Sequence, residues 1–442
     1  SEGIRQSGTL GQVIKKLLPQ GKTTVFKAQL RILPSVAFIS AFLNNTPVVV
    51  IFAPIIKHWA KSVKLPATKF LIPLSYVTIL GGICTLIGTS TNLVVHGMIL
   101  EAGYEGFTMF ELGKVGSFIA IAGIIYLFIF SKRLLPDARP DTAVPDEEVE
   151  EGEKLHRVEA VLGARFPGIN KKLSDFNFQR HYGAEVKEIK TRNGQRYVDH
   201  LEDVVLREGD TLVVMADDTF IPTWGESSVF VLLTNGNDPD TSGKKKRWLA
   251  LILLVLMIVG ATVGELPATK EMFPDIKLDM FFFVCITTII MAWTNIFPAR
   301  KYTKYISWDI LITIACAFAI SKAMVNSGVA DCVAGFIIGL SDDYGPHVLL
   351  AILFVITNLF TELITNNAAA ALAFPLALSI SAQLGVSPTP FFVVICMAAS
   401  ASFSTPIGYQ TNLIVQGTTD CYLSTCNLYF YSNLLASCIC SH

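Results

Sequence analysis

The segment SAFLNNTPVVVIFAP, residues 40–54, places two carboxamides, a hydroxyl and a proline inside an apolar stretch. No Asp, Glu, Lys or Arg occurs between residues 34 and 56. Polar groups in the hydrocarbon core of a bilayer are costly unless they face protein or water. The group Asn44, Asn45, Thr46 and Pro47 therefore predicts a break in a membrane helix, with a binding site at the break.

The composition indicates a membrane protein. Of the 442 residues 16% are charged and 52% are hydrophobic, with a mean hydropathy of +0.50, whereas soluble domains carry about 25% charged residues. Long stretches lack charge altogether: residues 70–100, 248–264, 280–298 and 363–419. A spanning helix needs about 20 apolar residues. We therefore expect a polytopic α-helical membrane protein and disfavour a large soluble enzyme. The net charge of −1 indicates no nucleic acid partner.

The chain is expected to divide into two membrane halves around a polar insert. Between residues 137 and 153 eight acidic residues meet one basic residue, which is typical of a solvated linker. Short alternating apolar runs with turn signals follow. Basic residues flank the insert at 131–133 and 244–247, so the positive-inside rule places residues 137–247 in the cytoplasm. The predicted units are a first transmembrane repeat lacking its true beginning (1–136), an acidic linker (137–155), a small α/β domain (156–234), a linker (235–247), a second transmembrane repeat (248–417) and a divergent tail (418–442).

A repeated motif relates the two membrane halves. TSTNLVVHG occupies residues 89–97 and YQTNLIVQG occupies residues 409–417. Asn45 lies 47 residues before Asn92, and Asn367 lies 45 residues before Asn412. Two linked features at nearly the same spacing indicate an internal repeat, as in secondary transporters.

The chemistry of these positions suits ions. Helix ends exposed inside a membrane offer unpaired N–H groups to an anion, and unwound carbonyls can coordinate Na⁺. A carboxamide carries both a donor and an acceptor, so one Asn can face a cation and an oxyanion. Pro47, Pro54, Pro375 and Pro406 suit helix breaks, as do the glycines near the motifs. A single such Asn would more simply join helices by hydrogen bonds, but the repeated set favours a binding site.

With these motifs the chain resembles the divalent-anion/sodium symporter family of the ion transporter superfamily. The two signature positions of that family fall on Asn44-Asn45-Thr46 and Asn366-Asn367-Ala368, and its unwound loops fall on GTSTN (88–92) and GYQTN (408–412). The resemblance implies two inverted repeats with re-entrant hairpins and broken helices, an elevator-type mechanism and a homodimer in the lipid bilayer. It implies no enzymatic activity, no cofactor and no metal other than sodium.

The resemblance also implies roles for individual residues. It assigns substrate binding to Asn45, Thr46, Asn366 and Asn367. It assigns one cation site to Ser40, Asn44, Asn45 and the Gly88 carbonyl, and a second to Asn367 and the carbonyls of Thr365 and Gly408. It places Thr89, Asn92, Thr411 and Asn412 in the unwound loops. Glu362 stands where the family tends to have Thr, and we count it among the cation-binding residues. Its carboxylate could ligate Na⁺ or carry a proton, which leaves sodium and proton coupling both open.

With FNFQRHYGAEVKEIKTRNGQR (176–196) and LEDVVLREGDTLVVMA (201–216) the insert resembles the TrkA-C (RCK C-terminal) domain of potassium-conductance regulators. Symporters with such an insert belong to the sulfate-permease branch, which implies cation-coupled import of sulfate or a similar divalent oxyanion at the plasma membrane, with a small ligand on the insert. A dicarboxylate- or arsenite-type anion permease and a membrane sensor of sulfur status are the alternatives. A potassium-channel-like complex is disfavoured because the sequence has no TVGYG-type filter.

Overall fold

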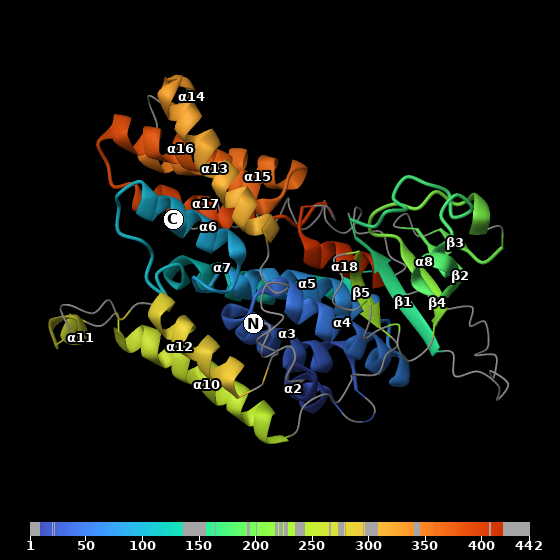
Figure 1. The fold of residues 1–442 in the computed structure, drawn as a ribbon. Coiled ribbons are helices and arrows are strands. Elements are labelled where there is room, and N and C mark those ends of the chain that lie inside the picture. Colours follow the sequence, from blue (N-terminus) through green and yellow to red (C-terminus); the bar gives the residue numbers. More distant parts are fainter. Residues whose placement is uncertain are drawn as a thin grey trace.

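The computed structural model is mostly helical, with one sheet at its side (Figure 1). The predicted acidic linker (137–155) and all of the predicted tail except Thr418 lie outside the described residues. The structure describes residues 9–19, 21, 23–135, 156–163, 165–191, 195–199, 201–216, 220, 224, 229–234, 244–264, 267–272, 278, 280–294, 296, 308–339, 345–405 and 408–418.

The first membrane half contains a helical hairpin with an extended tip. Helices α3 and α4 are separated only by Leu43 and Asn44, whose backbones are extended (φ −128°, ψ 140° and φ −55°, ψ 141°). The polar cluster of the sequence therefore begins a new helix instead of continuing the old one. The helices of this half are α2 (Thr9–Leu17), α3 (Val25–Phe42), α4 (Asn45–Ser62), α5 (Thr68–Gly82), α6 (Ser90–Glu101) and α7 (Gly113–Leu134).

The second half contains a hairpin with the same kind of tip. Helices α15 and α16 are separated by Ile364 and Thr365, which are also extended (φ −132°, ψ 179° and φ −69°, ψ 150°). The helices of this half are α10 (Lys244–Gly264), α11 (Pro267–Met272), α12 (Met280–Trp293), α13 (Trp308–Asn326), α14 (Val329–Gly339), α15 (Pro346–Leu363), α16 (Asn366–Leu384), α17 (Thr389–Ser400) and α18 (Gln410–Thr418).

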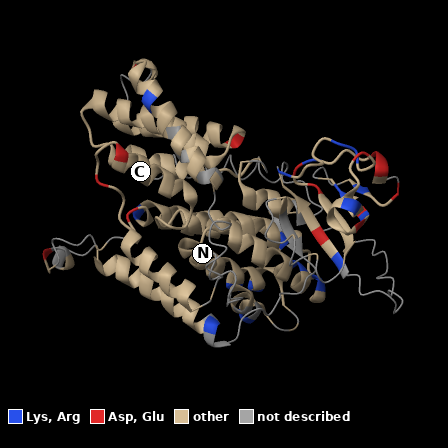
Figure 2. Ribbon diagram, viewed as in Figure 1, with Lys and Arg blue, Asp and Glu red and all other residues tan. Residues whose placement is uncertain are grey.

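Several helices are suited to a bilayer. Among the described residues, α3, the segment Gly113–Ser131 of α7, α15 and α16 are long and apolar enough to span a membrane. The pair α13 and α14, bent by 71°, would make a fifth span. On α7 the side chains of Phe118, Ile121, Ile125 and Ile129 recur on one face and are more than half exposed. An apolar face of this kind fits lipid, and most helices carry few charges along their length (Figure 2).

The two halves are interlocked. Helix α18 follows the second hairpin in sequence but packs against α4 and α5 of the first half, whereas α6 packs against α16 and α17 of the second. Accordingly Ile414 and Val415 lie in the core of the first half, and Val94 and Val95 lie in the core of the second. Each half therefore supplies one helix to the other, which brings both repeated motifs to the same region.

The two prolines at the middle of the hairpin helices do not break them, contrary to the sequence analysis. Pro54 lies inside α4 and Pro375 inside α16, at the same distance from the start of each helix. An interior proline removes one backbone hydrogen bond, but neighbouring helices can compensate for this in a membrane bundle. Both prolines are buried or partly buried among such neighbours. Of the other two predicted breakers, Pro47 lies in the first turn of α4 and Pro406 lies outside the described residues.

Residues 156–234 contain the described strands. The sheet has the order β3-β2-β4-β1-β5 with antiparallel pairs throughout, and β4 at its centre is almost completely buried. Aromatic side chains, among them Phe166, Phe176 and Tyr182, form its core. That this part is a separate α/β domain remains a prediction. Its elements are β1 (His156–Leu162), α8 (Phe178–Tyr182), β2 (Glu185–Lys190), β3 (Arg196–Tyr197), the 3₁₀ turn Leu201–Asp203, β4 (Thr211–Ala216) and β5 (Phe230–Thr234).

Candidate functional site

Four helix N-termini meet at one place between the halves. Helices α4, α6, α16 and α18 begin at Asn45, Ser90, Asn366 and Gln410, and hydrogen bonds join their first turns. Thr46 Oγ1 lies 3.2 Å from Gln410 Oε1, and Ser90 Oγ lies 3.3 Å from Asn367 Oδ1. Helix N-termini present unpaired N–H groups and positive dipole ends. The meeting point is therefore suited to an anion.

Beside this point the first half gathers several oxygens around the carboxamide of Asn45. Ser40 Oγ lies 2.8 Å from Asn45 Oδ1 and 2.9 Å from the Thr78 carbonyl oxygen, and its single proton can be donated to either of them. With the carboxamide turned over, its nitrogen donates to Ser40 Oγ at 2.8 Å, Thr78 O at 3.0 Å and Gly88 O at 3.3 Å. Either way one amide atom lies within 3.3 Å of three oxygens. The structure thus brings together Ser40, Asn45 and Gly88, three of the four residues expected at the first cation site.

The second half repeats this arrangement around Asn366. Thr361 Oγ1 lies 3.1 Å from Asn366 Oδ1 and 2.7 Å from the Ala399 carbonyl oxygen, and its single proton can be donated to either of them. Thr361 precedes Asn366 by five residues, as Ser40 precedes Asn45. The residue equivalent to Asn45 is therefore Asn366, one position earlier than the spacing of Asn367 indicates. The reason is local: Asn45 and Asn366 are each the first residue of a helix.

The remaining predicted residues of the tips have different surroundings. Asn367 Oδ1 accepts from Ser90 Oγ and from Thr91 Oγ1, each at 3.3 Å, so it joins the second tip to the first unwound loop. Asn44 and Thr365 are the N-cap residues of α4 and α16, and Thr365 is exposed. Their proposed contacts with cations remain predictions.

The two unwound loops are braced by the asparagines of the repeated motifs. Asn92 Nδ2 donates to the Thr85 carbonyl and Asn412 Nδ2 to the Ser402 carbonyl, each at 2.9 Å. Asn412 Oδ1 also accepts from Ser75 Oγ of the other half at 2.7 Å. These side chains satisfy backbone carbonyls that an unwound segment leaves unpaired. Both asparagines are fully buried, so the geometry gives them a structural part in the loops.

Two glycines let these loops approach their neighbours. A Cβ atom on Gly88 would overlap the backbone of Gly82, and one on Gly408 would overlap Ser402 Oγ and the Thr361 carbonyl. Neither position has room for a side chain, which explains why each unwound loop begins with Gly. Of the four residues predicted in the unwound loops only Thr89 precedes a helix; Asn92 lies in α6, and Thr411 and Asn412 lie in α18, so the prediction was wrong for these three.

Glu362 holds in place the segment 403–405, which leads into the second unwound loop. Its Oε1 accepts from the backbone N–H groups of Phe403 and Ser404 at 3.0 and 3.1 Å, and its Oε2 accepts from that of Thr405 at 2.8 Å. Thr405 Oγ1 returns a bond to the Glu362 carbonyl at 3.1 Å. Hydrogen bonds to a carboxylate are among the stronger ones in proteins. The carboxylate therefore replaces the helical partners that residues 403–405 lack.

Tyr409 is the main residue at this site that the sequence analysis did not single out. Its hydroxyl lies 2.5 Å from Asn45 Nδ2 and 3.0 Å from Thr89 Oγ1. The available signal was the alignment of TSTN with YQTN, which places Tyr409 opposite Thr89. Thr361 was also missed, although its distance of five residues from Asn366 could have indicated it.

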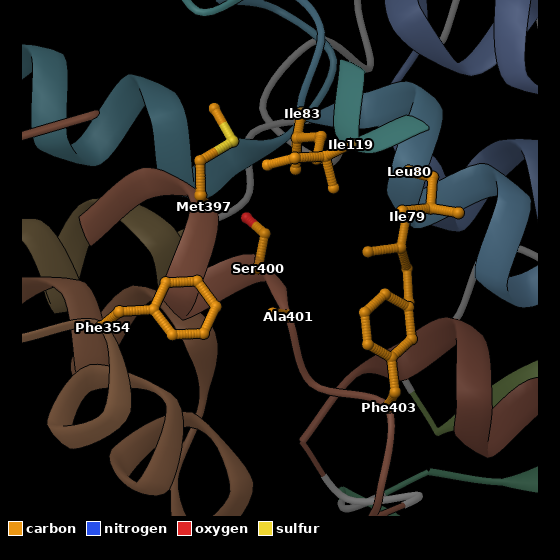
Figure 3. Close-up of a pocket in the computed structure, with 9 residues that line it drawn as sticks. All are labelled: Ile79, Leu80, Ile83, Ile119, Phe354, Met397, Ser400, Ala401 and Phe403. Atoms are coloured by element: carbon orange, nitrogen blue, oxygen red, sulfur yellow. The ribbon is translucent and has the colours of Figure 1, made fainter. Parts of the chain in front are cut away.

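A small cavity lies close to the second oxygen cluster. It has a volume of about 20 Å³ and is lined by apolar side chains of both halves together with Ser400 (Figure 3). The Ser400 hydroxyl is buried and makes no hydrogen bond within the described part of the chain. A space of this size can hold one water molecule. The cavity is too small and too apolar to be the anion site itself.

Comparison with known proteins identifies the family. The family model described as "CitMHS: Citrate transporter" matches residues 1–380 and 272–425, which is most of the chain. The chain belongs to the CitMHS citrate transporter family. As a member of that family it is a helical integral membrane protein of the anion-transporter type and a transporter rather than an enzyme.

Individual relatives agree with this family. An uncharacterized transporter of Synechocystis is 28% identical over 94% of this chain and 82% of the relative. The "Putative sulfur deprivation response regulator" of Chlamydomonas reinhardtii is 27% identical over 94% of this chain and 85% of the relative. Sodium/sulfate cotransporter 2 of the same alga is 30% identical over 59% of this chain and 29% of the relative. These relatives support an anion transporter.

Proposed function

We propose that this CitMHS family member imports sulfate, or a similar divalent oxyanion, in symport with sodium. The observation that carries the proposal is the meeting of four helix N-termini, at Asn45, Ser90, Asn366 and Gln410, between two clusters of oxygen atoms. The N-termini favour an anion. The names of the sodium/sulfate cotransporter relatives favour sulfate over the citrate of the family description.

The oxygen clusters are the proposed cation sites. The first comprises Ser40, Asn45 and the carbonyls of Thr78 and Gly88, and the second comprises Thr361, Asn366 and the Ala399 carbonyl beside Gly408. Neither includes a carboxylate, which suits a monovalent ion bound by carbonyl and amide oxygens. When the carboxamide oxygen of Asn45 faces the neighbouring oxygens, these oxygen atoms repel one another. A cation bound beside Asn45 would remove this repulsion and would therefore favour that orientation of the carboxamide.

Glu362 takes no direct part in coupling in this proposal. Both of its carboxylate oxygens already accept backbone hydrogen bonds, so binding a proton or Na⁺ would have to compete with three N–H donors. Sodium is therefore favoured over the proton as the coupling ion. The relatives named as sodium/sulfate cotransporters support the same choice.

The exchanged helices support an alternating-access mechanism built on two repeats. Thr46 of the first hairpin bonds Gln410 at the start of α18, and Asn367 of the second hairpin bonds Ser90 at the start of α6. Each hairpin thus makes the same contact with the other half, as expected for inverted repeats. Movement of both tips with both unwound loops as one body would make the mechanism elevator-type. A homodimer, a plasma-membrane location and a cytoplasmic TrkA-C-like insert that binds a small ligand complete the proposal.

Uptake in a sulfate-transport-deficient host tests the proposal. Radiolabelled sulfate uptake should require sodium, and replacement of sodium by choline should abolish it at every pH between about 5.5 and 8, a range that covers raised carboxylate pKa values. Unlabelled citrate and succinate are the competitors that test the other substrate classes. Sodium-independent uptake that rises with acidity would contradict sodium coupling, and uptake of citrate alone would replace sulfate as the substrate.

A second candidate function is a sensor of sulfur status that keeps the transporter fold. The relative named "Putative sulfur deprivation response regulator" covers 94% of the chain and supports it. The same uptake assay separates the two, because a sensor would bind sulfate without accumulating it. Binding can be followed as a rise in melting temperature with sulfate in detergent.

A further inference from the structure

Both hairpin tips and the first unwound loop meet at the hydroxyl of Tyr409. This hydroxyl lies 2.5 Å from the carboxamide of Asn45, accepting from its nitrogen in one orientation of the carboxamide and donating to its oxygen in the other, and it lies 3.0 Å from Thr89 Oγ1. It also hydrogen-bonds the side chain of Asn366. The side chain is only 7% exposed and belongs to the core of the first half. One oxygen atom therefore connects the two asparagines that begin α4 and α16.

Tyr409 breaks the equivalence of the two loops. In the matched motifs it occupies the position of Thr89. A threonine carries its hydroxyl on Cβ, whereas a tyrosine carries it at the far end of a rigid ring. From the second loop the hydroxyl consequently reaches the tip of the first hairpin and the tip of the second. From the first loop Thr89 reaches the Tyr409 hydroxyl.

This position affects any anion held between Asn45 and Asn366. The phenol hydroxyl lies against the asparagines of both tips, and the packing of the ring in the core holds it there. Its O–H group can donate to an anion at that point. A compact tetrahedral oxyanion needs only a short distance between donors, whereas a dicarboxylate needs room for a carbon chain between its two charged ends.

We propose that Tyr409 determines which anions the site accepts, its ring admitting compact oxyanions and excluding dicarboxylates while its hydroxyl donates to the bound oxyanion. This inference rests on the proposed transport function. It adds a residue that distinguishes substrate classes. In this inference the ring and the hydroxyl of Tyr409 have different effects, and two substitutions of Tyr409 can distinguish these effects.

The experiment compares Y409T, Y409F and wild type for labelled sulfate uptake, with selenate and succinate as competitors. Y409T introduces the residue found at position 89 and removes the ring. Succinate should therefore inhibit sulfate uptake by Y409T at a concentration at least tenfold lower than it needs in wild type. Y409F keeps the ring and loses the hydroxyl that would donate to the oxyanion, so its KM for sulfate should rise about tenfold while succinate remains excluded. The control is Y76F, which removes another buried phenol hydroxyl, one that donates to the Phe403 carbonyl at 3.3 Å. It should leave both the KM and the choice of anion unchanged.

The outcomes separate the two proposals. Wild type that accumulates no anion refutes the proposed function and this inference with it. Wild type that transports sulfate while Y409T still excludes succinate overturns only the role of Tyr409. If Y409T fails to reach the membrane, Y409F decides: an unchanged KM for sulfate, or succinate inhibition stronger than in Y76F and wild type, would overturn the inference.

Discussion

At the residue scale, the site depends on two asparagines that begin helices and contact several oxygens at once. Asn45 is fully buried and Asn366 is 9% exposed. Each bonds a hydroxyl five residues earlier and reaches Tyr409. A buried carboxamide with this many partners cannot be shortened without leaving several of them unsatisfied, which is costly in a water-free interior.

Removal of either carboxamide should abolish transport. We expect N45A and N366A to reduce sulfate uptake at least a hundredfold at normal membrane insertion, because each loses contacts with both the cation cluster and the anion point. The matched control is Q29A. Gln29 is a buried carboxamide that bonds the Lys69 carbonyl and Ser131 away from the tips, and its loss should cost about 0.6 kcal/mol of stability, typical of hydrogen bonds between membrane helices. Full uptake by both tip variants would exclude this site.

The carboxylate of Glu362 provides a separate prediction at the same scale. E362Q replaces one acceptor oxygen by an NH₂ group that faces backbone donors. Hydrogen bonds to charged groups contribute about 1.5–3 kcal/mol each, so the melting temperature in detergent should fall and uptake should decrease. The dependence of uptake on pH should stay as in wild type, since the carboxylate anchors a loop. Normal thermal stability combined with a lost pH dependence would instead identify Glu362 as a proton carrier.

At the element scale, the hairpins and the unwound loops are held by contacts that differ in sequence separation. Each tip is fixed within five residues by Ser40 or Thr361. Each loop is fixed by backbone carbonyls and by the helix after it, which packs on the opposite half. The loops thus depend on close approach, and Gly88 against the backbone of Gly82 is one example of it.

A methyl group at Gly88 should displace the first loop. G88A would place Cβ on the backbone of Gly82, so we expect loss of uptake and a destabilisation of several kcal/mol, in the range of overpacked cores. G97A is the control, since a Cβ there meets nothing within 4 Å and the residue lies inside α6. Alanine should stabilise that helix by up to about 1 kcal/mol. Equal behaviour of the two variants in uptake and melting temperature would disprove the packing argument.

At the scale of the whole molecule, the sheet docks onto the helices that begin at the candidate site. Lys57 Nζ of α4 lies 2.9 Å from Glu159 of β1, and Val161 of β1 joins the core of the first half. Helix α18 also contacts β1. Burial alone would raise the pKa of the Glu159 carboxyl, but Lys57, Lys190 and Arg157 outweigh burial and hold the pKa below its ordinary value. The sheet is therefore placed to respond to movement of α4.

Reversal of this ion pair should loosen the sheet from the helices. K57E and E159K should each increase proteolysis of the linkers at 137–155 and 235–247, and the double reversal should restore part of the protection. Because the docked pKa of Glu159 is lowered, its contribution is complete above the ordinary pKa of a glutamate and is lost as the pH falls through the docked value. Wild-type proteolysis should consequently increase toward low pH. Equal protection of wild type and both single variants would show that the pair does not hold the sheet.

The sequence by itself determined the features that depend on the free-energy cost of placing a local segment in a bilayer. Polar residues and glycines in a charge-free stretch are expensive in a bilayer, so the breaks at Asn44 and at the loops starting with Gly88 and Gly408 could be predicted, as could a membrane transporter. Short alternating runs also indicated strands between residues 156 and 234, where the structure has its sheet. Prolines were misread, because a bundle can satisfy the hydrogen bonds that Pro54 and Pro375 remove inside their helices.

Only the tertiary structure decided which groups share the site. Tyr409 meets Asn45 across 364 residues of chain, and Asn366 rather than Asn367 takes the place of Asn45. Glu362 finds its donors in a loop about 40 residues later, at residues 403–405. Such contacts depend on how the exchanged helices α6 and α18 pack, and a hydrogen bond requires positions correct to a few tenths of an ångström. Residue spacing within one segment fixes no distance to another segment, which is why the sequence indicated the region of the site and the fold assigned its partners.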